Sequence, residues 1–182
     1  MTRRRRNSPP LDRTRINDLA LSYVARFATS SGRLEAYLQR KMRERGVVDG
    51  EEIDVPAIVA RMVELRYIDD EAYARARSGG LLRKGYGARR VEEALRAAGI
   101  EEGVRDEIAP GERAKRLAAF TLARKRGFGP FGREAPDPSR REKQIAAMIR
   151  AGHGFEAARA LVDAPDEETA EDWLAEAEEW EE

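Results

Sequence analysis

Three glycines at equal spacing constrain the fold of this chain more than any other feature. Gly46, Gly99 and Gly152 lie 53 residues apart. Each follows an apolar residue by four positions, and the last two precede another by nine; these residues are Met42, Leu95, Met148, Ile108 and Leu161. Glycine just after a helical stretch is a common C-terminal cap, and a fixed period of this length is typical of tandem repeats. The spacing therefore predicts three tandem three-helix repeats, stacked because one such unit cannot bury its own apolar faces.

The apolar residues between these glycines follow the period of an α-helix. The first such stretch, residues 16–27, has apolar side chains at helical spacing, which predicts that they all face a core: Ile16, Leu19, Ala20, Tyr23, Val24 and Phe27. Hydrophobic residues make up 41% of the chain and charged residues 37%, a balance that favours a thin, elongated body over a sphere with a thick core. We therefore expect an all-α, elongated array of three tandem three-helix repeats.

The repeats are expected at residues 16–68, 69–109 and 110–164. Residues 1–15 are rich in arginine and contain Pro9 and Pro10, so like-charge repulsion and the prolines predict a disordered basic arm. Residues 165–182 are predicted to form an acidic C-terminal helix or tail.

The formal net charge of zero conceals an asymmetry. Residues 163–182 contain 11 acidic residues and no basic one, which leaves 34 basic and 23 acidic residues, a net charge of +11, in the rest of the chain. A basic body with an acidic tail indicates a binder of polyanions or of protein–nucleic acid assemblies. The alternative is that these charges only keep a helical protein soluble.

Basic residues recur near the second helix of each repeat. They are Arg33, Arg40, Lys41, Arg43 and Arg45 in the first repeat, Arg83, Lys84, Arg89 and Arg90 in the second, and Arg124, Lys125, Arg126, Arg140, Arg141 and Lys143 in the third. Stacked repeats would align these groups into a basic strip able to neutralise phosphates or acidic protein patches. The candidate binding residues are Arg33, Arg40, Lys41, Lys84, Arg89 and Arg90, with Tyr86 for stacking or packing. Solvated helix faces are the alternative.

Residues suited to catalysis are few. The chain has one histidine and no cysteine, which excludes His/Cys metal sites and cysteine nucleophiles. His153 directly follows a predicted helix-ending glycine, where a packing role is expected, and Asp69–Asp70 fits a helix cap. No phosphate-binding loop is present. We therefore expect no enzyme activity, no metal site and no cofactor. No apolar run approaches the roughly 20 residues that cross a bilayer, and a cytoplasmic location is expected.

The acidic C-terminal segment has an apolar face of its own, formed by Ala170, Trp173, Leu174, Ala177 and Trp180. One interpretation is a last helix that packs Trp173 on the third repeat. The other is a mobile acidic helix that competes for the basic strip of the same chain.

Several of these residues resemble the RecX family of bacterial RecA regulators. The clearest likeness is the run Lys84-Gly85-Tyr86-Gly87-Ala88-Arg89-Arg90-Val91, followed by Leu95, Gly99 and Ile100. Ahead of it, Tyr67-Ile68-Asp69-Asp70 and then Ala72, Tyr73 and Ala74 resemble the entry into the second repeat of the family. Looser likeness extends over about residues 16–162 and includes Arg26, Ser30, Leu34, Leu38 and Gly46, and then Arg150, Gly152 and Leu161. The chain departs from the family at Arg33-Leu34, where Glu-Leu is usual, and at His153, where an aromatic is usual.

The resemblance implies a curved row of three-helix repeats. It also implies a negative regulator that binds in the groove of the RecA filament on single-stranded DNA and inhibits ATP hydrolysis, strand exchange and coprotease activity, in DNA repair and the SOS response. The expected partners are the RecA filament and single-stranded DNA, with double-stranded DNA as a further option; no membrane partner is expected, and the chain is expected to be monomeric. A helix-turn-helix transcriptional regulator is the rival reading, and a plain scaffold protein is a weaker third.

Overall fold

The structure, a computed structural model, describes residues 9–177, and helices are the regular secondary structure of this range. Within that range there are ten α-helices, one short 3-10 helix and no strand, so the predicted all-α fold is confirmed. The chain divides into two compact units. The first contains the residues up to Tyr73 together with 98–100, and the second contains residues 74–97 and those from Glu101 onward.

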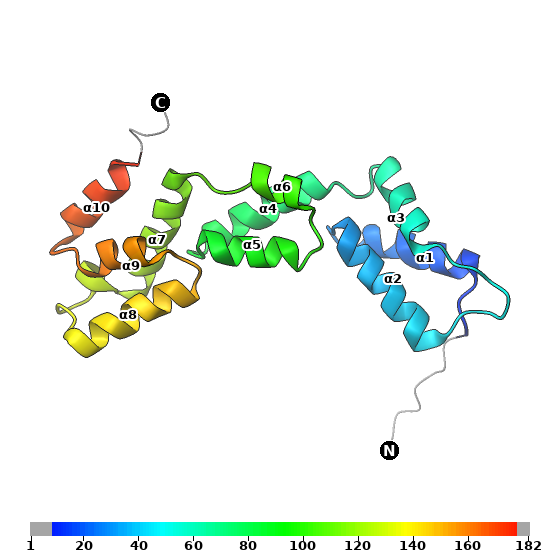
Figure 1. The fold of residues 1–182 in the computed structure, drawn as a ribbon, viewed down its shortest axis with the longest axis horizontal. Helices are drawn as coiled ribbons and strands as arrows, with labels where there is room; N and C mark the ends of the chain where they lie inside the picture. The colour runs from blue at the N-terminus through cyan, green and yellow to red at the C-terminus, as the bar shows by residue number, and fades with distance from the viewer. Residues whose placement is uncertain (1–8, 178–182) are drawn as a thin grey trace, which may run out of the picture. The chain divides into compact units, whose positions relative to one another are not determined.

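The first unit is built from three helices that pack around one core (Figure 1). They are α1 (Arg13–Val24), α2 (Ser31–Arg45) and α3 (Val55–Glu64). Each begins after a polar residue whose side chain accepts a hydrogen bond from a backbone N–H three residues on: Asp12, Ser30 and Asp54. Such N-caps satisfy a backbone donor that the first helical turn leaves unpaired, which explains why the helices start where they do.

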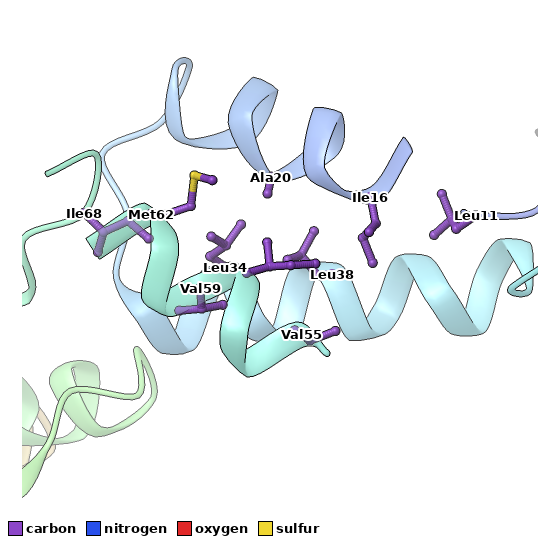
Figure 2. Close-up of a cluster of buried hydrophobic side chains, with 10 residues drawn as sticks. Leu11, Ile16, Ala20, Leu34, Leu38, Val55, Val59, Met62 and Ile68 are labelled. Carbon is purple, nitrogen blue, oxygen red and sulfur yellow. The ribbon is translucent and has the colours of Figure 1, made fainter. Parts of the chain in front are cut away.

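Apolar side chains from all three helices meet in the core of the first unit, as Figure 2 shows. Ile16 and Ala20 come from α1, and Leu34 and Leu38 from α2, opposite the side chains of α3. The buried set comprises Leu11, Ile16, Ala20, Leu34, Leu38, Val55, Ile58, Val59, Met62 and Ile68. Its members on the helices recur at spacings of three or four residues, as amphipathic helices require.

The expectation that residues 1–15 form a disordered arm is wrong for residues 11–15. Leu11 is 0% exposed. Its backbone N–H donates to the Gly46 carbonyl at 2.9 Å, and its carbonyl accepts from Val48 N–H at 2.9 Å. Helix α1 then starts at Arg13. A single buried leucine that is hydrogen-bonded across the chain therefore outweighs the local charge repulsion. The arginine run at residues 3–6 lies outside the described residues.

Phe27 is a second departure, because its side chain is 55% exposed rather than part of the core. Helix α1 ends at Val24, so Phe27 no longer follows the helical spacing that would point it inward. Its ring instead lies 5.2 Å from the Tyr23 ring, measured between centroids.

The second unit holds the remaining helices. These are most of α4 (Asp70–Leu82), then α5 (Ala88–Arg96), α6 (Glu102–Glu107), α7 (Glu112–Arg126), the 3-10 helix η1 (Gly129–Phe131), α8 (Pro138–Arg150), α9 (Phe155–Val162) and α10 (Glu167–Ala175). Helices α7, α8, α9 and α10 share one buried cluster that includes Phe120, Met148, Leu161 and Ala170. The glycine- and proline-rich segment after α7 forms η1 and the connection to α8.

Two of the three helix-ending glycines, Gly99 and Gly152, each lie against another glycine within their own unit. Gly46, Gly99 and Gly152 all have positive φ angles, of 76°, 70° and 99°, which favour glycine at a helix end. In the first unit, a Cβ on Gly32, at the start of α2, would lie 2.7 Å from the Gly99 Cα. In the second unit, a Cβ on Gly87, before α5, would lie 2.3 Å from the Gly152 carbonyl oxygen. We call these two contacts, Gly32–Gly99 and Gly87–Gly152, the glycine joints.

Helix α10 packs on the second unit. Trp173 lies against the core cluster, the Arg116 guanidinium stands 4.8 Å from the centre of its ring, and Arg116 also donates to the Trp173 carbonyl. Ala170 and Ala177 are buried. For residues 167–177 the packing interpretation is therefore confirmed; Trp180 lies outside the described residues.

Candidate partner interface

A basic cavity of about 490 Å³ lies in the second unit. Its walls are the turn between α4 and α5, the C-terminal part of α7 with the residues after it, and the end of α8. The lining residues are Lys84, Tyr86, Leu122, Lys125, Arg126, Phe128, Ala147, Arg150 and Ala151. We call this site the cationic hollow.

Among residues 9–177, four cations and no acidic side chain line the cationic hollow. Lys84, Lys125, Arg126 and Arg150 are all exposed at the surface, and none of them forms an ion pair with any residue in the described part of the chain. Basic residues in the last turn of a helix interact favourably with the helix dipole, which gives the cations of α7 and α8 a local reason for their places. Their convergence on one cavity gathers four positive charges that no acidic side chain among residues 9–177 pairs with.

Aromatic and aliphatic side chains form the rest of the wall. Tyr86 is 38% exposed and Phe128 is half-buried. Gly85, with φ of 87°, allows the turn to pass close to α7, because a Cβ there would stand 3.1 Å from Leu122. The hollow therefore combines an apolar wall with a cationic rim.

The glycine joint at Gly87–Gly152 holds two walls of the cationic hollow together. Gly87 N–H donates to the Ala151 carbonyl at 2.9 Å, and the buried His153 ring donates from Nε2 to the Gly85 carbonyl at 2.9 Å. Burial lowers the pKa of His153, and the hydrogen bond to Gly85 opposes that shift. The predicted packing role of His153 is confirmed. A site held by backbone contacts loses little conformational freedom when it binds a partner.

Two of the predicted binding residues, Arg89 and Arg90, take part in internal contacts. The Arg89 guanidinium donates to the Ile149 carbonyl at 2.8 Å, and Glu93 pairs with Arg89 at 3.8 Å and with Arg90 at 3.3 Å. Arg89 therefore ties the start of α5 to the end of α8, next to the glycine joint. Lys84 and Tyr86, by contrast, line the hollow.

The predicted residues of the first repeat lie in the first unit. Arg33 donates to the Tyr73 hydroxyl at 2.9 Å. Arg40 and Lys41 pair with Glu44 at 3.7 and 2.7 Å, and they stand 5.6 and 5.8 Å from the centre of the Tyr37 ring. Tyr37 stacks on Tyr23 at 4.3 Å. These cations flank an aromatic stack, and each already has a partner. The continuous basic strip stays a prediction.

Sequence reasoning missed part of the cationic hollow. Lys125 and Arg126 belong to the basic group of the third repeat but are not among the predicted binding residues, and neither Arg150 nor Phe128 is predicted to bind a partner. The only available signal was charge near the ends of α7 and α8. Among residues 9–177 no three His, Cys, Asp or Glu side chains gather as metal ligands, and none of the described helices is both long enough and apolar enough to cross a bilayer.

Known proteins resemble this chain in sequence and in fold. A family model described as "RecX, second three-helix domain" matches residues 69–107. A "Regulatory protein RecX" from Myxococcus xanthus is 32% identical over 160 residues, which cover 82% of this chain and 85% of the relative. One from Agrobacterium fabrum is 35% identical over 113 residues, covering 62% and 60%. The crystal structure of RecX from Lactobacillus salivarius matches with a TM-score of 0.62 at 14% identity, over 89% of this chain and 96% of that one.

The fold and the hollow define a helical-repeat protein whose candidate site is a contact surface. The sequence relationship to the Myxococcus xanthus protein, over most of both chains, then settles the family. The chain belongs to the RecX family of regulatory proteins. The structural likeness confirms the helical-repeat fold, and the relatives support a regulatory role without favouring the helix-turn-helix transcriptional regulator.

Proposed function

We propose that this chain is a negative regulator of RecA that binds in the groove of the RecA–single-stranded DNA filament. There it inhibits ATP hydrolysis, strand exchange and coprotease activity, and so acts in DNA repair and the SOS response. It acts by occupying a surface and makes or breaks no covalent bond. We place it in the cytoplasm as a monomer. Membership of the RecX family is the observation that carries this proposal.

The cationic hollow supports the proposal as one contact surface. A filament on single-stranded DNA carries phosphates, and four cations around one cavity, none of them paired with an acidic residue in the described range, are suited to phosphates or to carboxylates. Arg40 and Lys41 beside Tyr37 in the first unit, exposed enough to exchange their pairing with Glu44, are a second group of cations next to an aromatic ring. Two weak contacts on one chain gain from effective concentration when both can be made at once, which suits a partner built from repeated subunits.

The direct test is ATP hydrolysis by RecA on single-stranded DNA at rising concentrations of this protein. The wild-type chain is expected to reduce the rate. In Lys84→Ala with Lys125→Ala, two exposed charge contacts of about 0.5–1 kcal/mol each are lost, so half-inhibition should need roughly 5- to 30-fold more protein. Arg89 is left intact, because its contact with the Ile149 carbonyl belongs to the fold.

The matched control is Arg124→Ala with Lys143→Ala. Both side chains are exposed cations of the second unit, and neither lines the cationic hollow. The control should inhibit like the wild type. ATP hydrolysis that is unaffected by a stoichiometric amount of folded wild-type protein would refute the proposed function. Equal losses in the control and in the hollow variant would show that only overall charge matters.

A further inference from the structure

We propose that the cationic hollow binds one nucleotide, with the base against Tyr86 and Phe128 and the phosphate among the cations of the rim. The same chemistry is offered by a nucleotide within a single strand and by a free nucleotide. The inference rests on the proposed function only in treating the hollow as a contact surface. It is tested without RecA, so the two ideas can fail separately.

The size of the hollow fits such a ligand. Its volume of about 490 Å³ falls within the roughly 300–1,000 Å³ of small-molecule sites. A bare phosphate or a single carboxylate would leave most of that space to solvent. A ligand that joins an anion to a flat apolar group uses both the rim and the wall.

The distribution of charge points to a polyanion. Lys84 comes from the turn after α4, Lys125 and Arg126 from α7, and Arg150 from α8. Three separate segments thus bring positive charge to one place, although like charges repel. The helix dipole accounts for basic residues at each helix end, but it does not require them to surround the same cavity.

The aromatic wall favours a nucleotide over an acidic peptide. Tyr86 is 38% exposed, and no hydrogen bond joins its hydroxyl to any residue that the structure describes. An open ring beside cations is the arrangement by which proteins hold single-stranded nucleic acid, because every base has a flat face that stacks on an aromatic ring. Carboxylates on a peptide would engage the rim but would not need the ring.

The turn that carries Tyr86 is already fixed. Gly85 lies against Leu122, and the Gly85 carbonyl accepts a hydrogen bond from buried His153. The next glycine, Gly87, is held by the Ala151 carbonyl. Tyr86 is thus anchored on both sides by backbone contacts, and binding does not have to order the loop.

The test measures the binding of a fluorescently labelled oligothymidylate by anisotropy, with the full chain at several salt concentrations. Tyr86→Ala should weaken binding roughly 5- to 150-fold, the usual effect of losing one base–aromatic stack, with an unchanged salt slope. Lys125→Ala with Arg150→Ala should lower the slope of log affinity against log salt by about 0.7, since one phosphate contact on a single strand contributes about 0.7.

Controls separate the nucleotide from other ligands. Tyr86→Phe should bind like the wild type, and Arg124→Ala with Lys143→Ala should keep the affinity of the wild type. On an abasic strand, which keeps the phosphates but lacks the bases, Tyr86→Ala should have no effect. Competition by ATP that is lost in Tyr86→Ala would identify a free nucleotide as the ligand; failure of ATP to compete would identify a nucleotide within a strand.

Three results would overturn the inference. One is an unchanged affinity and salt slope in both hollow variants, with helicity retained by circular dichroism. The second is no binding of the oligonucleotide or of ATP by the wild type at low salt. The third is a glutamate-rich peptide that binds more tightly than the oligonucleotide and loses its affinity in the hollow variants, which would assign the hollow to an acidic protein partner.

Discussion

A methyl group at Gly87 should damage the second unit far more than the small size of the change suggests. The Cβ of Gly87→Ala would stand 2.3 Å from the Gly152 carbonyl oxygen and 2.5 Å from the His153 backbone nitrogen. An ordinary contact needs at least 3.4 Å, so the two turns must separate by about 1 Å. Because the φ of Gly87 is −81°, alanine suits the backbone itself, and the whole cost comes from this clash.

The separation breaks hydrogen bonds that cross the joint. These are Gly87 N–H to the Ala151 carbonyl at 2.9 Å, Arg89 N–H to the Gly152 carbonyl at 3.2 Å, and the His153 contact with Gly85 at 2.9 Å. At about 0.5–1.5 kcal/mol for each bond, the free energy of unfolding should fall by about 2–4 kcal/mol. Urea denaturation followed by circular dichroism measures this change.

Gly80→Ala is the matched control. Gly80 lies in α4, and a Cβ there would meet nothing within 4 Å. Since glycine costs about 0.5–1 kcal/mol in a helix relative to alanine, this variant should be more stable than the wild type. If Gly87→Ala unfolds within 0.5 kcal/mol of the wild type (well under the expected loss), the joint is not the rigid contact that we describe.

Three further predictions concern other parts of the chain. Ser30→Ala removes the N-cap of α2 and the donor to the Ala98 carbonyl. Denaturation should therefore show that the free energy of unfolding falls by about 2–3 kcal/mol; a loss no larger than that from removing an exposed N-cap alone would contradict this. Burial lowers the pKa of His153, so near its ordinary pKa of about 6.5 the unfolded chain binds more protons, and the free energy of unfolding should fall as the pH drops through that value. His153→Gln should flatten this dependence, and an unchanged pH profile would argue against it. Arg116→Ala removes the cation over Trp173, and the tryptophan emission should shift to the red if α10 loosens; an unchanged spectrum would show that the core cluster alone holds the helix.

The sequence supported the helices and the repeat pattern because both depend on local chemistry. A helix that ends in a left-handed turn favours glycine, so Gly46, Gly99 and Gly152 could be found by spacing alone. The partners Gly32 and Gly87 could not, because nothing near them in sequence signals that another turn passes within 3 Å of where their Cβ atoms would stand. Leu11 was missed for a related reason, since its hydrogen bonds are to Gly46 and Val48.

The cationic hollow could be predicted only in part. Lys84 and Tyr86 stand in a short turn between glycines, where sequence motifs direct attention. Arg150 and Phe128 reach the same cavity from α8 and from the residue after Gly127, and only the packing of α7 against α8 brings them there. Arg89 has the same local setting as Lys84, yet its side chain bonds to the Ile149 carbonyl. Charge and position in sequence do not distinguish these two roles.

The glycine joints have a consequence for how such chains diverge. Each joint is a contact between main-chain atoms that is possible because glycine has no side chain. The joint therefore does not depend on which side chains cover the surrounding helix surfaces. Those surfaces can exchange residues freely as long as two small positions keep their spacing. The crystal structure of RecX from Lactobacillus salivarius is only 14% identical to this chain and still superposes with a TM-score of 0.62. Such a result is expected when the packing of the helices depends on the absence of side chains at a few glycines.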